Sequence, residues 1–172
     1  MPDLFHLDIR LLQAEDIAPI AQAFAVLGWN KPAAQYERYL AEQKAGTRVC
    51  LVAFVENDFA GYVNVLWQPD YEPFRTAGIP EVADFNVLPS YRRRKIGTRL
   101  MAEAEATIAQ QSTLAGIGVG LYPDYGAAQQ LYVLRGYVPD GRGVTYNTRV
   151  LQPMESTVND DNLVLYFTKQ LA

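Results

Sequence analysis

Cysteine and histidine are almost absent from this chain of 172 residues, which contains one of each. Cys50 has no second cysteine with which to form an internal disulfide, a composition typical of a reducing compartment. No apolar run approaches the roughly 20 residues that a membrane-spanning helix needs. The first ten residues also lack the basic-then-apolar pattern of a signal peptide. These absences predict a soluble cytoplasmic protein that does not insert into a membrane.

An excess of positive charge is absent as well. The chain has 15 basic and 19 acidic residues, a net charge of −4 and a pI near 5.0. Nucleic-acid binding over a broad face depends on neutralising phosphates, so no nucleic-acid partner is expected. With 49% hydrophobic and 20% charged residues, the composition excludes disorder and predicts one domain over residues 1–172.

Strand-like and helix-like patterns alternate along the chain. Strands are expected at 5–12, 49–56, 59–67, 81–88 and 115–121, with two more starting near Tyr137 and Leu163. Helices are expected at about 17–27, 31–45, 96–111 and 126–135. This order predicts an α/β or α+β fold, in which helices cover both faces of a mixed, parallel and antiparallel sheet.

Three details of this pattern are specific enough to test. The dipeptide Asn57-Asp58 joins two β-rich runs and predicts a hairpin, because both residue types tolerate positive φ. The run 49–56 is apolar on both faces, which predicts a central strand. The segments 68–79 and 140–162 are expected to be loops, and the second is long enough to be functional or mobile.

The basic residues gather at one point, where Arg92, Arg93, Arg94 and Lys95 are consecutive. They follow a strand that stops at Pro89 and precede a helix. Helix N-termini present unpaired N–H groups and partial positive charge, so a pyrophosphate is a natural ligand there. A solvated charge run that caps a helix explains the same residues. Neither a P-loop nor a GxGxxG turn before a helix is present.

Two motifs in this chain resemble those of the GNAT (Gcn5-related) N-acetyltransferases. The first is Val87-Leu88-Pro89-Ser90-Tyr91-Arg92-Arg93-Arg94-Lys95-Ile96-Gly97, similar to the family's V-x-P strand end followed by [QR]-x-x-G-x-[GA]. The second runs from Tyr125 to Tyr137 and is similar to N-x-x-A-x-x-L-Y-x-x-x-G-[FY]. Their order and the order of predicted elements match the family over nearly the whole chain.

The resemblance implies an acetyl-CoA-dependent transfer of an acetyl group to a primary amine of a small molecule or peptide, without a metal. The backbone of Phe85 and Val87 would bind the acetyl and pantetheine arm where their strand splays from its neighbour. Tyr132 would protonate the departing thiolate as general acid. The pyrophosphate loop would comprise Arg92, Arg93, Arg94, Lys95, Ile96, Gly97 and Thr98.

The chain departs from the family pattern at three positions. Lys95 stands at the first motif glycine, where a positive φ would strain it by about 1 kcal/mol. Tyr125, a candidate cofactor-binding residue, replaces an asparagine, and Gly120 lies where some relatives carry a glutamate base. Gly120 and Tyr125 motivate a second hypothesis, a non-catalytic acyl-CoA-binding regulatory or sensor module.

The general base is the least defined part of the site. Glu81 and Asp84 on the strand leading to the cofactor are candidates, and Asp124 is a third. Each also reads as an ordinary carboxylate at a strand end. His6 and Cys50 are expected to be structural. The acceptor amine is expected to bind near the first two helices and segment 140–162, and a homodimer is compatible with the eleven tyrosines and two tryptophans.

Overall fold

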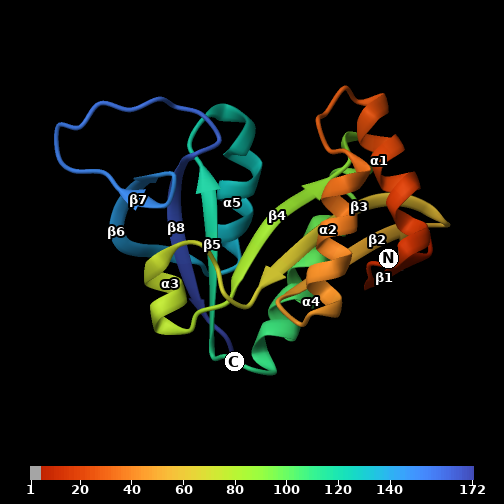
Figure 1. Cartoon of the computed structure of the whole chain (residues 1–172), viewed down its shortest axis with the longest axis horizontal. Coiled ribbons are helices and arrows are strands. Elements are labelled where there is room, and N and C mark those ends of the chain that lie inside the picture. The colour runs from red at the N-terminus through yellow and green to blue at the C-terminus, as the bar shows by residue number, and fades with distance from the viewer. Residues whose placement is uncertain (1–4) are drawn as a thin grey trace. The chain divides into compact units, whose positions relative to one another are not determined.

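The computed structural model describes residues 5–172, whose elements are labelled in Figure 1. The strands are β1 (Leu7–Leu11), β2 (Arg48–Val55), β3 (Asp58–Leu66), β4 (Glu81–Val87), β5 (Leu114–Gly120), β6 (Val138–Tyr146), β7 (Arg149–Val150) and β8 (Leu163–Gln170). The α-helices are α1 (Ile17–Val26), α2 (Ala33–Lys44), α3 (Glu72–Ala77), α4 (Ile96–Ala109) and α5 (Gly126–Leu134). Short 3-10 turns precede α1, α4 and α5.

The chain divides into two compact units. The first contains the residues up to Leu66 together with Asp84–Ala104, and the second contains Trp67–Ala83 and Glu105–Ala172. Strand β4 and helix α4 each contribute residues to both units.

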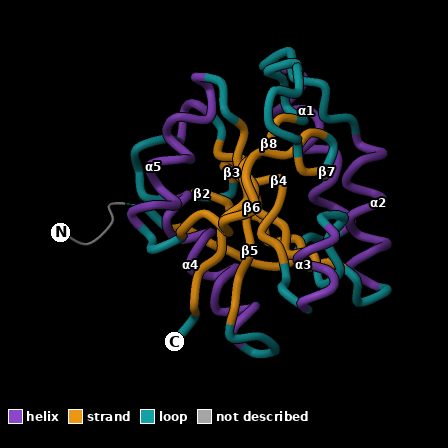
Figure 2. Tube along the Cα trace, turned by 90° about the vertical axis from the view of Figure 1, so that its left-hand side faces the viewer, coloured by secondary structure: helices purple, strands orange, loops and turns teal. Residues whose placement is uncertain are grey.

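In the first unit the strand order is β1-β2-β3-β4. β2 pairs antiparallel with β1 and with β3, and the N–H of Leu88 donates to the carbonyl of Ala60 just after β4. Helices α1 and α2 lie on the side of these strands opposite to α4 (Figure 2). The central, doubly covered position expected for 49–56 is therefore confirmed, since β2 is buried along most of its length.

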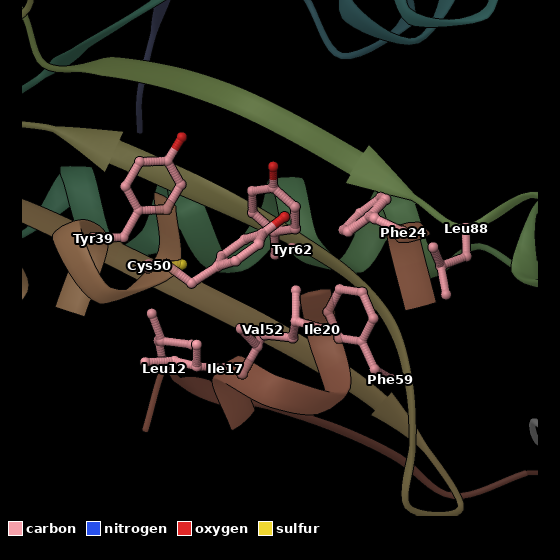
Figure 3. Packing of buried hydrophobic residues seen from close by; sticks show 11 residues of the cluster. Leu12, Ile17, Ile20, Phe24, Tyr39, Cys50, Val52, Phe59, Tyr62 and Leu88 are labelled. Carbon is pink, nitrogen blue, oxygen red and sulfur yellow. The ribbon is translucent and has the colours of Figure 1, made fainter. Parts of the chain in front are cut away.

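The core of the first unit lies between α1, α2 and the strands (Figure 3). Ile17, Ile20 and Phe24 recur at helical spacing on α1, and all three are buried. Each such side chain contributes about 1.5–3 kcal/mol when fully buried. Cys50 lies in this core with no exposed surface and no disulfide, as expected for a structural cysteine.

In the second unit the order is β4-β5-β8-β6-β7. An antiparallel ladder runs along β5 and β8, whereas the parallel ladder of β4 with β5 consists of Glu81 with Gly116 and Val82 with Ile117. A core cluster of Tyr71, Phe74, Ile79 and Tyr166 supports it. Gly116 is required in β5 because a Cβ there would approach the Phe74 ring to 2.3 Å.

The fold class is confirmed, and three local expectations are wrong. Segment 68–79 contains helix α3, which accommodates Pro73 in its first turn. Segment 140–162 contains residues 140–146 of β6 and all of β7. The hairpin turn lies one residue earlier than expected, because Glu56 and Asn57 carry the positive φ and Asp58 begins β3.

Within residues 5–172, every helix is too short or too polar to cross a membrane.

Candidate functional site

The backbone between β4 and α4 turns twice through the left-handed region. Arg93 has φ of +59° and Lys95 has φ of +60°, values that L-residues other than glycine rarely adopt. Lys95, which stands at the first glycine position of the motif, therefore has the backbone conformation of a glycine. Alternation of left- and right-handed residues gathers successive N–H groups into a concave anion-binding surface. The positive φ that would strain Lys95 by about 1 kcal/mol is therefore present.

The N-terminus of α4 adds donors to this loop. The first intrahelical bond that reaches the loop is donated by the N–H of Arg99 to the carbonyl of Lys95, at 3.0 Å. The N–H groups of Ile96 and Gly97 precede that bond and carry the positive end of the helix dipole. A Cβ on Gly97 would lie 3.0 Å from Cζ of Phe85, so glycine fits closely against that ring. These groups suit a pyrophosphate.

The cationic side chains of the loop are not equivalent. Arg92, Arg93 and Lys95 are exposed, as is the Thr98 side chain. Arg94 instead lies over two aromatic rings, with its guanidinium carbon 4.2 Å from the centroid of Phe5 and 5.5 Å from that of Tyr91. Arg92 Nε donates to the carbonyl of Val87 at 3.2 Å. Arg94 is thus held by packing, and the other cations face solvent.

Asp84 is the centre of a hydrogen-bond cluster in the first unit. Oδ1 accepts from Lys31 Nζ at 2.9 Å and from Asn86 Nδ2 at 3.0 Å. Oδ2 accepts from the hydroxyl groups of Tyr62 at 2.5 Å and Tyr39 at 2.7 Å, and from Gln35 Nε2 at 3.2 Å. Figure 3 shows the Tyr39 and Tyr62 hydroxyls on the side of the core nearest β4.

These donors keep Asp84 ionised. Burial disfavours the charged carboxylate, but the charge of Lys31 and the hydrogen bonds outweigh it, so the pKa of Asp84 lies below its ordinary value. A carboxylate offers about four lone-pair positions, and five side chains already donate to this one. Asp84 is therefore poorly suited to accept a further proton from a substrate.

Glu81 lies three residues earlier on the same strand, and its pKa is shifted in the opposite direction. Burial, and secondly the negative charge of Asp70, raise the pKa of Glu81 to about 7. Neither a hydrogen bond nor an ion pair to its carboxyl group is found among residues 5–172. A carboxyl group with a pKa near neutrality exchanges protons readily at physiological pH, the property required of a general base.

Tyr132 lies on α5 in the second unit and is 5% exposed. Burial raises the pKa of its hydroxyl above the ordinary value of 10, so the phenol is protonated at neutral pH. Its hydroxyl has no hydrogen-bond partner within the described part of the chain. The side chain is thus a buried proton donor whose proton is not committed to another residue.

Gly120 and Tyr125, the two residues of the second unit that differ from the family pattern, pack against each other. A Cβ on Gly120 would meet the Tyr125 ring at 2.3 Å, so the ring covers the space that a side chain at position 120 would take. The Tyr125 hydroxyl donates to Asp161 Oδ1 at 2.8 Å, and the Tyr122 hydroxyl donates to the same atom. Burial and Asp161 raise the pKa of Tyr125. Glycine and tyrosine are therefore complementary here.

The other candidates are less constrained. Asp124 is exposed in the turn before α5, and His6 is exposed, with its backbone N–H donating to Glu56. Asp160 accepts from the Tyr146 hydroxyl, so both acidic residues of the 160–161 pair already bind tyrosines. In the part of the chain that the structure describes, no three His, Cys, Asp or Glu side chains are grouped as metal ligands.

The sequence-predicted site residues fall into two groups. Asp84, Phe85, Val87 and the loop 92–98 lie in the first unit, and Glu81, Tyr125 and Tyr132 lie in the second. Lys31, Gln35, Tyr39, Tyr62 and Asn86, which surround Asp84, were not predicted as site residues. Four of them, Lys31, Gln35, Tyr39 and Tyr62, lie 22 to 53 positions from Asp84 in the sequence, and contacts over such separations leave no local pattern. Asn86 lies two positions after Asp84 on the same strand.

Comparison with known proteins supplies independent information. Residues 14–137 match the model of a family described as "Acetyltransferase (GNAT) family". This range includes both motifs and covers more than half of the chain. Among curated protein sequences, none gives a significant match.

Solved structures with the same fold are numerous. An acetyltransferase of the GNAT family from Desulfovibrio desulfuricans superposes with a TM-score of 0.72 at 15% identity, covering 97% of this chain and 100% of that one. The acetyltransferase yncA of Salmonella typhimurium, solved with acetyl-CoA, gives 0.69 at 16% identity, with 96% and 94% coverage. Ribosomal-protein-alanine N-acetyltransferase from Brucella melitensis gives 0.69 at 18%, with 95% and 99% coverage. At these identities, the likeness establishes the fold alone.

Proposed function

This chain belongs to the GNAT acetyltransferase family, and we propose that it transfers the acetyl group of acetyl-CoA directly to a primary amine of a small molecule or a peptide. The observation that carries the proposal is the loop before α4. There, two left-handed residues and unpaired helix N–H groups form an anion site at the position of the family motif. The residues present fit the pyrophosphate of acetyl-CoA.

The first unit supplies the groups proposed to bind acetyl-CoA. The N–H groups from Arg93 to Thr98 face the pyrophosphate, and exposed Arg92, Arg93 and Lys95 reach its oxygens. Hydrogen bonds to charged groups contribute about 1.5–3 kcal/mol each. The backbone of Phe85 and Val87 binds the acetyl and pantetheine arm. Because a carbonyl oxygen accepts two hydrogen bonds, the bond from Arg92 to Val87 leaves one position for the arm.

Glu81 is proposed as the general base, in preference to Asp84. A lysine-like ammonium has a pKa near 10.4, so its neutral form costs roughly 4–5 kcal/mol at pH 7. Glu81 accepts the proton that the ammonium must lose, and its pKa of about 7 suits this step. The neutral nitrogen then attacks the acetyl carbonyl carbon, and no enzyme nucleophile takes part.

Tyr132 is proposed to complete the reaction as general acid. As the new C–N bond forms, the C–S bond breaks and the sulfur carries the electron pair away. The Tyr132 hydroxyl, protonated at neutral pH, gives its proton to that sulfur. The products are the N-acetylated amine and CoA with a free thiol. The nitrogen loses its second proton as the amide forms, and a proton delivered through solvent restores the Tyr132 phenol. Glu81 then releases the proton that it took from the ammonium to solvent.

The alternative, a non-catalytic acyl-CoA-binding module, was motivated by the loss of a glutamate at position 120. The carboxyl group of Glu81 supports the enzyme instead, because it provides a base from another strand. We also propose that residues 1–172 act as one cytoplasmic domain, since the family match extends over both units.

The first experiment is titration of acetyl-CoA into the full chain by calorimetry, followed by release of CoA thiol in the presence of primary amines. Micromolar binding and amine-dependent thiol release are expected. Binding without release for any amine class would support the module. No binding at millimolar acetyl-CoA would mean that Lys95 and Tyr125 prevent cofactor binding, and the proposal would fall.

A matched pair of tyrosine variants tests the acid. Tyr132→Phe is expected to bind acetyl-CoA normally and to lower kcat by about 10²-fold, within the range for acid–base catalysis. Tyr137→Phe is the control, since Tyr137 is also buried in the second unit and its hydroxyl has no hydrogen-bond partner among residues 5–172. Equal losses in the two variants would assign the effect to packing and remove Tyr132 from the mechanism.

A further inference from the structure

Asp84 combines two features that are rarely found together within a strand. Its φ is +43°, in the left-handed region, although it lies in the middle of β4. Its carboxylate accepts hydrogen bonds from five side chains. Non-glycine residues keep such a conformation only where the surroundings over-determine it, and they concentrate at functional sites. The carboxylate cluster is what holds this backbone turn in place.

The donors come from three separate parts of the first unit. Lys31 precedes α2, Gln35 and Tyr39 lie on α2, Tyr62 lies on β3, and Asn86 follows on β4 itself. The Lys31 ammonium also donates to the Tyr62 hydroxyl at 2.9 Å and lies 5.5 Å from the centroid of that ring. The turn at Asp84 is therefore fixed against both α2 and β3.

The backbone that follows Asp84 lies close to that of β3. A Cβ on Gly61 of β3 would lie 2.5 Å from the carbonyl oxygen of Asn86 and 3.1 Å from Cα of Val87. Only glycine allows this approach. At the next residue after Val87, the N–H of Leu88 donates to the carbonyl of Ala60. The turn thus sets the direction of the peptide groups from Phe85 to Val87.

We propose that Asp84 is a positioning residue: anchored by Lys31, Tyr39 and Tyr62, it holds the left-handed turn in β4 that aims the peptide groups of Phe85 and Val87 at the acetyl and pantetheine arm of acetyl-CoA. This inference rests on the proposed function. It assigns a task to a buried ion cluster that neither proton transfer nor pyrophosphate binding uses. Through Gln35 and Tyr39, α2 would then help to position β4, the strand proposed to bind the acetyl group.

The test is Asp84→Asn in the full chain, which keeps the size of the side chain and removes its charge. We expect kcat to fall about 10- to 100-fold, since small misplacements of reacting groups have effects of this size. Affinity for CoA without an acetyl group should stay within twofold, because the loop 92–98 is intact. The pH profile of the remaining activity should keep its limb near pH 7, since Glu81 is unchanged.

Asp16→Asn is the matched control. Asp16 is a buried carboxylate of the same unit, held by Arg10 at 2.7 and 2.8 Å, and it lies outside the proposed site. It should lower thermal stability while kcat stays within twofold. Tyr39→Phe is the milder second variant, because it removes one donor from Asp84 and retains the ring; about a threefold to tenfold loss of kcat is expected.

Each contrary result overturns the inference. An unchanged kcat in Asp84→Asn would show that the turn does not matter, and loss of the limb near pH 7 would make Asp84 the base. Equal losses in Asp16→Asn would reduce the effect to general stability. Absence of acetyl-CoA binding in the unmodified protein would overturn both the role of Asp84 and the proposed acetyl transfer. The other contrary results concern the role of Asp84 alone.

Discussion

Two carboxylates on β4, three residues apart, have opposite surroundings. Asp84 in the first unit accepts five side-chain hydrogen bonds and has a lowered pKa. Glu81 in the second unit is half-buried and lacks such donors among residues 5–172, and its pKa is raised to about 7. Both are acidic residues of one strand, and the sequence alone made both candidates for the same role.

The difference shows that burial alone does not decide what a carboxylate does. Burial disfavours the charge of both residues, but an ammonium and aligned hydroxyl groups reverse the outcome at Asp84. A carboxylate kept permanently ionised can hold structure in place, whereas one that titrates near neutrality can move protons. The two residues therefore suit different tasks in one acetyl transfer.

The largest effect is expected from removing the proton acceptor. Glu81→Gln should lower kcat by about 10²- to 10⁴-fold, the usual contribution of a general base. The steady rise of activity through about pH 7 should disappear from the pH profile. Glu72→Gln, which changes an exposed glutamate of the same unit, should leave kcat within twofold. A retained pH limb in the Glu81 variant would assign proton transfer to another group.

The same kind of substitution at Asp84 should destabilise the protein. Asp84→Asn is expected to lower the free energy of unfolding by about 2–4 kcal/mol at pH 7, because Lys31 loses its counter-charge. The native pKa of Asp84 lies below the unfolded value near 3.9, so its stabilisation is present above that pH and is lost as pH falls further. Urea unfolding at pH 7 and pH 3 measures this, and a loss as large at pH 3 as at pH 7 would contradict it.

At Glu81 the effect of removing the charge on stability should have the opposite sign. A raised native pKa means that ionising Glu81 costs stability, and the cost grows as pH rises from the unfolded value near 4.3 through about 7. Glu81→Gln should therefore stabilise the protein by about 1–3 kcal/mol at pH 8 and have little effect at pH 4. Thermal unfolding at the two pH values tests this. A variant less stable than the unmodified protein at pH 8 would show that the carboxylate has a partner.

A smaller effect is expected from the neighbour of Glu81. Asp70→Asn removes the negative charge that contributes to the raised pKa of Glu81. The midpoint of the pH profile should then move below 7 by roughly half a unit, because like charges raise a carboxyl pKa. Burial, the larger cause, is unaffected, so most of the shift should persist. A midpoint that does not move would attribute the pKa of Glu81 to burial alone.

The smallest effect is expected at Lys95, another left-handed residue of the first unit. Lys95 also has positive φ, but it is exposed and has no side-chain anchors like those of Asp84. Lys95→Gly relieves strain of about 1 kcal/mol, offset by the greater freedom of glycine in the unfolded chain. Stability should change by less than about 1 kcal/mol, and acetyl-CoA affinity only modestly. A large loss of affinity would show that the Lys95 charge dominates pyrophosphate binding.

The elements that the sequence predicted correctly depend on neighbours in the chain. The spacing of Ile17, Ile20 and Phe24 marks α1, and Pro89 with the following basic residues marks the passage from β4 to α4. Helix α3 was missed because its six residues include Pro73 and have too little periodicity to differ from a loop. Strand β7 has two residues and forms only through pairing with β6.

The sequence by itself determined the family, the fold class and the loop proposed to bind pyrophosphate, because motif spacing and periodicity are local properties of the chain. Only the tertiary structure distinguished the surroundings of Glu81 from those of Asp84. The donors to Asp84 come from Lys31, Gln35, Tyr39 and Tyr62, distant in sequence, and the pKa of Glu81 follows from its burial. A carboxylate's charge state is set by the atoms packed around it, and folding is what brings those atoms together.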